Sequence, residues 1–148
     1  MEVEDPLMMN GFKLTKNFAL HEFESPDTHE VKIIPELVLL LQKVRDRIGK
    51  PIQVTSGYRT PEHNRAIGGA KHSFHMKGMA ADIICWKTSR FDLARVCFEA
   101  GFPCTILYPD KPHVHVDIRE EFKGIVVDVK GKLIPYSEYK GKWKLYRR

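Results

Sequence analysis

The stretch AADII, residues 80–84, places a single carboxylate, Asp82, among apolar residues that are typical of a buried strand. Burying an ionised carboxylate is strongly unfavourable unless a cation or a set of hydrogen bonds compensates for the lost water. A fold that contains this strand must therefore place a compensating partner beside Asp82, and a metal cation is one such partner. A lone aspartate at a strand end more often caps a turn, so Asp82 needs support from other residues.

A second polar pattern occurs later in the chain, in HVHVD at residues 113–117. Side chains alternate between the two faces of a strand, so His113, His115 and Asp117 are expected on one face. That face can meet the loop at residues 68–79, which is polar and contains glycine. Loops of this kind are where functional residues are usually found.

His75 lies in that loop, seven residues before Asp82. A catalytic zinc site needs about three protein ligands, drawn from histidine and carboxylate, and leaves a fourth position to water. His75, Asp82 and one histidine of the HVHVD pattern would supply that set. Taken alone, a loop histidine is usually exposed to solvent, and only the combination favours a metal.

Hydrophobic periodicity predicts helices early in the chain and strands toward its end. Proline, threonine or serine opens each expected helix and glycine follows it, over residues 34–50, 60–69 and 88–101. Strands are expected at residues 51–56, 80–84, 104–108, 113–118 and 125–136, the last segment with a Lys-Gly turn between its halves. This order predicts an α+β fold, with a largely antiparallel sheet and flanking helices. No repeat or linker interrupts residues 1–148, which are expected to form one domain.

Composition excludes several classes of protein. The 148 residues are 43% hydrophobic, enough to form a core that needs no disulfide or structural metal to fold. The three cysteines lack a CxxC spacing. Buried, reduced thiols are therefore expected. No apolar run approaches the roughly 20 residues of a membrane span, and the acidic start MEVEDPLMMNGF is unlike a signal peptide. The chain is expected to be made in the cytoplasm without a secretion signal.

The net charge of +5 favours a polyanionic partner, either a nucleic acid or an anionic cell wall. Much of the excess lies in the tail KGKWKLYRR, residues 140–148. We interpret this tail as a solvated terminal strand rather than as a contact for phosphates. No nucleic-acid partner is expected, and the protein is expected to be a monomer.

The segment SGYRTPEHNRAIGGAKHSFHMKGMAADI, residues 56–83, followed by HVHVD, resembles the zinc D-Ala-D-Ala carboxypeptidase family. That family shares its fold with phage L-alanyl-D-glutamate endolysins and the hedgehog signalling domain. The resemblance runs from about residue 14 to residue 118, which leaves the C-terminal strands and basic tail, 119–148, outside it. The matching residues are Ser56, Gly57, Tyr58, Arg59, Asn64, Gly68, Gly69, Ser73, His75, Gly78, Ala80, Asp82, His115 and Asp117.

The resemblance implies Zn²⁺ as the cofactor, with His75, Asp82 and His115 as its ligands. An alternative third ligand is His113, because Asp110 three residues before it resembles the Asp-x-Pro-His arrangement of the phage endolysins. His115 is preferred because the His-x-Asp form fits the carboxypeptidase-like branch, and because the hedgehog branch uses the second histidine of such a pair.

Four further residues are candidates for catalysis or substrate binding. Asp110 or His113 is the candidate general base and acid, and the sequence does not choose between them. Arg59 is implied to bind substrate or to stabilise charge in the transition state, its alternative being a surface ion pair with Glu62. Ser73 is implied to bind substrate, and a role in capping the loop is the equal alternative.

The implied function is a zinc metallopeptidase that hydrolyses bonds involving D-amino acids in peptidoglycan stem peptides, of the D-Ala-D-Ala carboxypeptidase type. The first alternative is an L-alanyl-D-glutamate endopeptidase of the endolysin type, and the second is a zinc-bearing binding module without catalysis. An enzyme of either type would act at the cell wall, and a phage-borne or lysis-released route fits the expected lack of a signal peptide.

Overall fold

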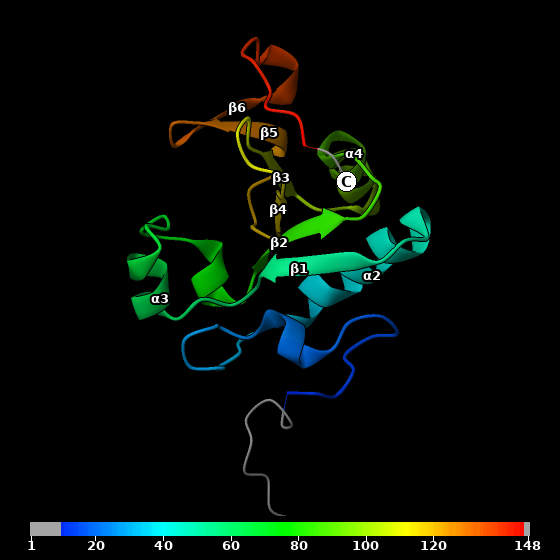
Figure 1. Ribbon diagram of the computed structural model, residues 1–148, viewed down its shortest axis with the longest axis vertical. Helices are drawn as coiled ribbons and strands as arrows, with labels where there is room; N and C mark the ends of the chain where they lie inside the picture. The colour runs from blue at the N-terminus through cyan, green and yellow to red at the C-terminus, as the bar shows by residue number, and fades with distance from the viewer. Residues whose placement is uncertain (1–9, 147–148) are drawn as a thin grey trace, which may run out of the picture.

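A computed structural model describes residues 10–146, and its centre is one six-stranded mixed sheet (Figure 1). The strand order across the sheet is β1-β2-β4-β3-β5-β6, and each neighbouring pair is antiparallel except β3 with β5, which is parallel. The predicted α+β class and largely antiparallel sheet are confirmed. The strands are β1 Ile52–Ser56, β2 Ala80–Cys85, β3 Cys104–Leu107, β4 Val114–Asp117, β5 Gly124–Val129 and β6 Lys132–Pro135.

Two helices, α2 (Pro35–Ile48) and α4 (Arg90–Ala100), pack against each other, and α4 packs against the central strands. Both form where the periodicity predicts them. Proline opens α2, and Gly49 ends it with a φ of 70°, a left-handed conformation that glycine adopts without strain. Ser89 caps α4, because its side chain accepts a hydrogen bond from the backbone of Asp92. None of the helices within residues 10–146 is long and apolar enough to cross a membrane.

The remaining helical turns are short. The short helix α3 (Pro61–Ala66) follows β1 and is capped by Thr60 as predicted, and Figure 1 shows it beyond the end of that strand. Three 3-10 turns complete the described chain: η1 Leu20–Phe23, η2 Phe74–Lys77 and η3 Tyr136–Glu138. Among them, η2 leads directly into β2 and thereby ties the polar loop to the sheet.

The basic tail departs from the prediction. Its described part, residues 140–146, forms no strand but runs back across α4. The Trp143 ring packs edge-on against Phe91 at 4.9 Å between centroids, and Arg90 donates a hydrogen bond to the Lys144 carbonyl at 2.6 Å. The expected strand is therefore wrong for these residues, although most of them are exposed to solvent as expected, and Trp143 packs on an apolar surface of α4. Arg147 and Arg148 lie outside the described residues.

Candidate metal centre

The strand register brings two of the expected ligands together. Asp82 on β2 pairs directly with His115 on β4, and His115 in turn pairs with Ile106 on β3. Because alternate residues point to opposite faces, the neighbours Ile83 and Val114 point into the helical layer, where both are fully buried. Asp82 and His115 therefore lie side by side on the sheet face that is opposite the main core.

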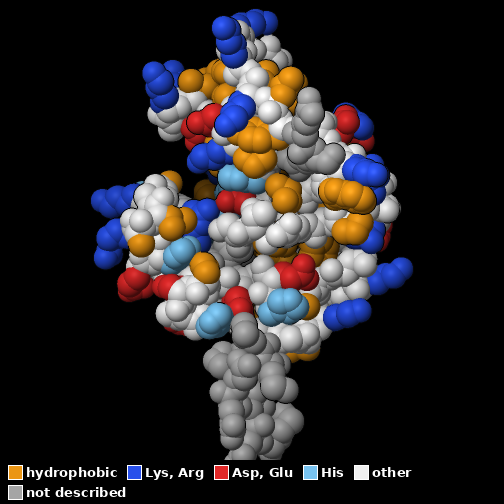
Figure 2. Space-filling model, in the orientation of Figure 1, with side chains coloured by type: hydrophobic (Ala, Val, Ile, Leu, Met, Phe, Trp, Pro, Cys, Tyr) orange, Lys and Arg blue, Asp and Glu red, His pale blue; other side chains and the backbone are white. Residues whose placement is uncertain are grey.

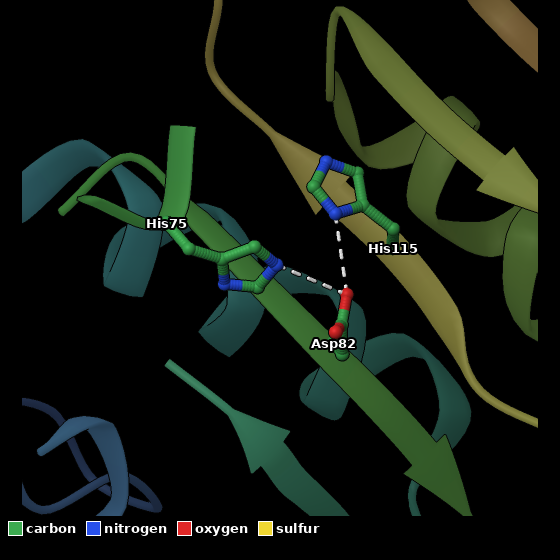
Figure 3. A group of neighbouring side chains, drawn as sticks. All are labelled: His75, Asp82 and His115. Atoms are coloured by element: carbon green, nitrogen blue, oxygen red, sulfur yellow. Dashed lines mark hydrogen bonds and ion pairs between the residues drawn. The ribbon is translucent and has the colours of Figure 1, made fainter. Parts of the chain in front are cut away.

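His75 reaches the same place from η2. Ser73 begins this turn by accepting a hydrogen bond from the His75 backbone at 3.2 Å. The His75 ring donates from Nδ1 to the Gly57 carbonyl at 2.7 Å, since a carbonyl can only accept. Its other nitrogen, Nε2, points at Asp82 Oδ1, 3.2 Å away (Figure 3).

The His115 ring is oriented in a similar way by a carboxylate. Its Nε2 donates to Asp117 Oδ2 at 2.7 Å, and its Nδ1 lies 3.2 Å from Asp82 Oδ1. A carboxylate or carbonyl that holds the outer nitrogen of a histidine is the usual support for a metal-binding imidazole. Both histidines thus present one supported ring nitrogen to the same carboxylate oxygen.

These three side chains fit a divalent cation. His75, Asp82 and His115 are all buried, and one donor atom from each lies within 4.8 Å of the others. Two imidazole nitrogens and one carboxylate oxygen form a set that zinc accepts, with room left for a further ligand. The structure brings together all three residues that the sequence analysis named, and their role as ligands stays a prediction.

The electrostatics of the site favour positive charge. Burial raises the pKa of Asp82, but hydrogen bonds from His115 and His75 outweigh burial and hold that pKa well below its usual range. Burial lowers the pKa of His115, yet its bonds to Asp117 and Asp82 raise the pKa to about 9. Two carboxylates on either side of one imidazole therefore stabilise a cation at this point.

Arg59 lies against the other oxygen of Asp82. Its Nη2 donates to Asp82 Oδ2 at 3.1 Å, and its Nε donates to Ser56 at 3.0 Å. Its Nη1 donates to Asn64 Oδ1 at 3.3 Å. A Cβ on Gly69 would lie 2.0 Å from that amide oxygen, so only glycine permits this arrangement. The ion-pair partner of Arg59 is Asp82, not Glu62.

The two candidate proton-transfer residues lie in different surroundings. His113 is partly exposed, lines the cleft and has its Nε2 3.7 Å from Asp82 Oδ2. Burial lowers its pKa. Asp110 is exposed, is not part of the cleft wall and holds the tail by accepting a hydrogen bond from the Tyr146 hydroxyl to its backbone carbonyl. The structure brings His113 to the site and leaves Asp110 outside it.

A cleft of about 660 Å³ opens above the three buried residues. Figure 2 shows the hollow between the segment around α3 and the β5–β6 hairpin, with histidine and acidic side chains at its back. Ser73 also lines the cleft, so its capping bond does not remove it from reach of a substrate. The wall is mostly cationic in its charged groups, which include Arg59, Lys71, Lys111 and Arg119 besides Asp128.

The sequence analysis did not single out several of these wall residues. Tyr108 lies two residues before the Asp-Lys-Pro-His motif and Lys111 lies within it, and that closeness was the available signal. Arg119 follows Asp117 by two residues, which predicts the same strand face if the strand continues. Asp128 and Leu133 come from the β5–β6 hairpin, and nothing in the local pattern places that hairpin beside the cleft.

Comparison with known proteins gives two findings. Residues 7–117 match the family described as Peptidase M15. A segment of 81 residues is 40% identical to the protein named zinc D-Ala-D-Ala carboxypeptidase from Streptomyces albus G. This second match covers 51% of the present chain and 31% of that relative, so the chain matches less than a third of the relative's length.

Proposed function

This chain belongs to the peptidase M15 family, and from that premise we propose that it is a zinc-dependent peptidase acting on peptidoglycan stem peptides. The bond we assign involves a D-amino acid, in the manner of a D-Ala-D-Ala carboxypeptidase. The observation that carries the proposal is the buried His75, Asp82 and His115 group, which lies at the base of a cleft large enough for a peptide.

Three atoms would hold the metal in this proposal: His75 Nε2, Asp82 Oδ1 and His115 Nδ1, which lie close together. The other ring nitrogen of each histidine is already bonded, to the Gly57 carbonyl in His75 and to Asp117 in His115. Bound zinc supplies a Lewis acid that polarises the scissile carbonyl and makes an attacking water acidic near neutral pH. Asp82 Oδ2 remains with Arg59, so one carboxylate serves both the cation and the guanidinium.

His113 accepts and returns the proton during hydrolysis. Its ring nitrogen faces the cleft beside Asp82, within reach of a water that attacks from the cleft side. Asp110 is the weaker candidate because it does not line the cleft. Arg59 stabilises negative charge that develops on the scissile carbonyl, as a guanidinium fixed in a partly buried position can do without reorganising.

The charge of the cleft wall supports a substrate that carries carboxylates. Lys71, Lys111 and Arg119 all line it, and stem peptides end in a carboxylate. Ser73 can donate its hydroxyl to such a peptide while it accepts from the His75 backbone, because a hydroxyl does both. The relative's printed name, a D-Ala-D-Ala carboxypeptidase, supports the choice of bond.

We also propose the fold family, the domain organisation and the place of action of the protein. We assign it the fold shared by D-Ala-D-Ala peptidases and the hedgehog domain, on the basis of the mixed sheet and family membership. One domain is supported by the single sheet, which β5 and β6 extend. The protein would act at the cell wall as a monomer, with peptidoglycan peptides as its partners.

The decisive experiment is mass spectrometry of the fragments that the zinc-loaded protein releases from purified peptidoglycan. Release of D-Ala that stops on chelation is the expected result. His115→Ala should be as inactive as the chelated protein, whereas His21→Ala, which changes an exposed histidine outside the cleft wall, should retain full release.

Other products would point to one of the two alternative functions. Cuts between L-Ala and D-Glu would establish the endopeptidase alternative, and the same metal group would then act on an internal bond. No release from any wall chemotype, with zinc demonstrably bound, would refute hydrolysis and leave a zinc-bearing binding module.

A further inference from the structure

We propose that Arg119 is a positioning residue that holds both histidines of the metal centre in place. The inference rests on the metal binding proposed above. Arg119 follows β4, and it contacts two groups that come from distant parts of the chain: Asp117 behind His115, and Phe74 next to His75.

The first contact orients His115. Arg119 donates from Nε to Asp117 Oδ1 at 2.8 Å and from Nη2 to Asp117 Oδ2 at 2.7 Å. Asp117 is fully buried, and its Oδ2 also accepts from His115 at 2.7 Å. A two-bonded guanidinium fixes the plane of a carboxylate in a way that a single ammonium cannot. The orientation of Asp117, and through it of the His115 ring, therefore depends on Arg119.

The second contact involves the turn that carries His75. The guanidinium carbon of Arg119 lies 4.5 Å from the centre of the Phe74 ring, a distance at which a cation is attracted to an aromatic face. Phe74 and His75 are adjacent residues of η2. The same side chain therefore links the strand that bears one histidine to the turn that bears the other.

The contacts of Arg119 suit a positioning role. Its side chain is only 15% exposed, although it lines the cleft. The contacts described above commit its Nε and Nη2 to Asp117 and place its guanidinium carbon over the Phe74 ring. Arg59 differs in that it contacts Asp82, one of the proposed ligands, directly, whereas Arg119 acts through groups that are not ligands themselves.

The test measures metal affinity by competition with a chromophoric chelator, together with the visible spectrum of the Co²⁺-substituted protein. Arg119→Ala is expected to weaken zinc binding about 10–100-fold, the usual cost of removing a group that orients a metal-binding histidine. The Co²⁺ spectrum should change as well, because the ring geometry is altered. Arg119→Lys should remain weaker than the natural protein, since lysine keeps the charge but not the two-bonded fork.

Two further variants separate this role from a general effect of charge or folding. Arg95→Ala removes an exposed arginine on α4 and should leave affinity and spectrum unchanged. Phe74→Leu keeps an apolar side chain but removes the ring, and it should weaken binding less than Arg119→Ala. Natural affinity and an unchanged Co²⁺ spectrum in Arg119→Ala would overturn the proposal, as would full recovery in Arg119→Lys. These readouts need no substrate, so a failure to cleave peptidoglycan would not be mistaken for a failure of this inference.

Discussion

The two faces of strands β2 and β4 have opposite chemistry although they share the same backbone. On the face toward α2 and α4, Ile83, Val114 and Val116 are fully buried in the main apolar core. On the other face, Asp82 and His115 are nearly as buried, at 5% and 7% exposure, yet both are ionisable. Residue by residue, the strands alternate between stabilising the fold and building the site.

The difference shows that burial has two consequences in this sheet. Apolar burial stabilises by roughly 25 cal/mol for each Å² removed from water, whereas a buried charge is costly unless it is paired. Asp82 is paired with Arg59 and two histidines, so the polar face is tolerated rather than favoured. Substitutions on the two faces should therefore affect different measurements.

Asp82→Asn should have the largest effect, and on metal binding. The amide keeps the shape but removes the charge that faces His75, His115 and Arg59. Zinc affinity is expected to fall roughly 100-fold to a few thousand-fold, since breaking a buried ionic contact costs about 3–5 kcal/mol. Chelator competition measures the change, with circular dichroism to confirm folding. Affinity close to that of the natural protein would mean that the metal binds elsewhere.

Ile83→Ala, one residue along the same strand, should lower stability and leave zinc binding almost unchanged. Ile83 is fully buried among core residues, so its truncation should lower the free energy of unfolding by about 2–5 kcal/mol. Its side chain points away from the metal centre, and zinc affinity of the folded protein should change little. Urea denaturation and chelator competition on the same sample test the pair of statements. A large loss of zinc affinity would show that the two faces are coupled.

Gly78→Ala should lower both the free energy of unfolding and the zinc affinity, because this glycine lies between η2, which carries His75, and strand β2. It ends η2 with a φ of 70°, and an added Cβ would lie 2.5 Å from the Lys32 carbonyl oxygen. A non-glycine residue in this conformation costs about 1–3 kcal/mol, before any displacement of the neighbouring backbone. We expect lower stability and weaker zinc binding together, since His75 lies three residues earlier. Gly68→Ala is the matched control, as its φ is 71° but nothing lies within 4 Å of its added Cβ.

The sequence predicted the features of the two strand faces and of the helix ends that depend only on local pattern. Asp82 within AADII and His115 within HVHVD follow from alternation along a strand, and the cap at Thr60 follows from residue type. For α4, residue type narrowed the cap to Thr88 or Ser89, and the structure has Ser89. These features need only neighbours in the chain, so their signals survive in a single sequence.

The features that the sequence missed depend on contacts between distant segments. Trp143 packs on Phe91, 52 residues earlier in the numbering, and this contact turned an expected strand into a docked tail. The contact of Arg119 with Phe74 is of the same kind. The choice between Asp110 and His113 also required the structure, because both residues lie in one short loop and only their positions relative to the cleft differ.

Ser89→Ala should have the smallest effect, and it should lower only the stability of the fold. The Ser89 hydroxyl accepts a hydrogen bond from the Asp92 backbone at 3.1 Å, and loss of such a cap costs about 1 kcal/mol. Urea denaturation should show this decrease, and Ser89→Asp should restore most of it, because aspartate caps equally well. Zinc affinity should be unchanged in both variants, since α4 packs only on the apolar face of the central strands. A change in zinc affinity from so small a loss of stability would mean that helix α4, and not the strand register alone, holds the metal centre in shape.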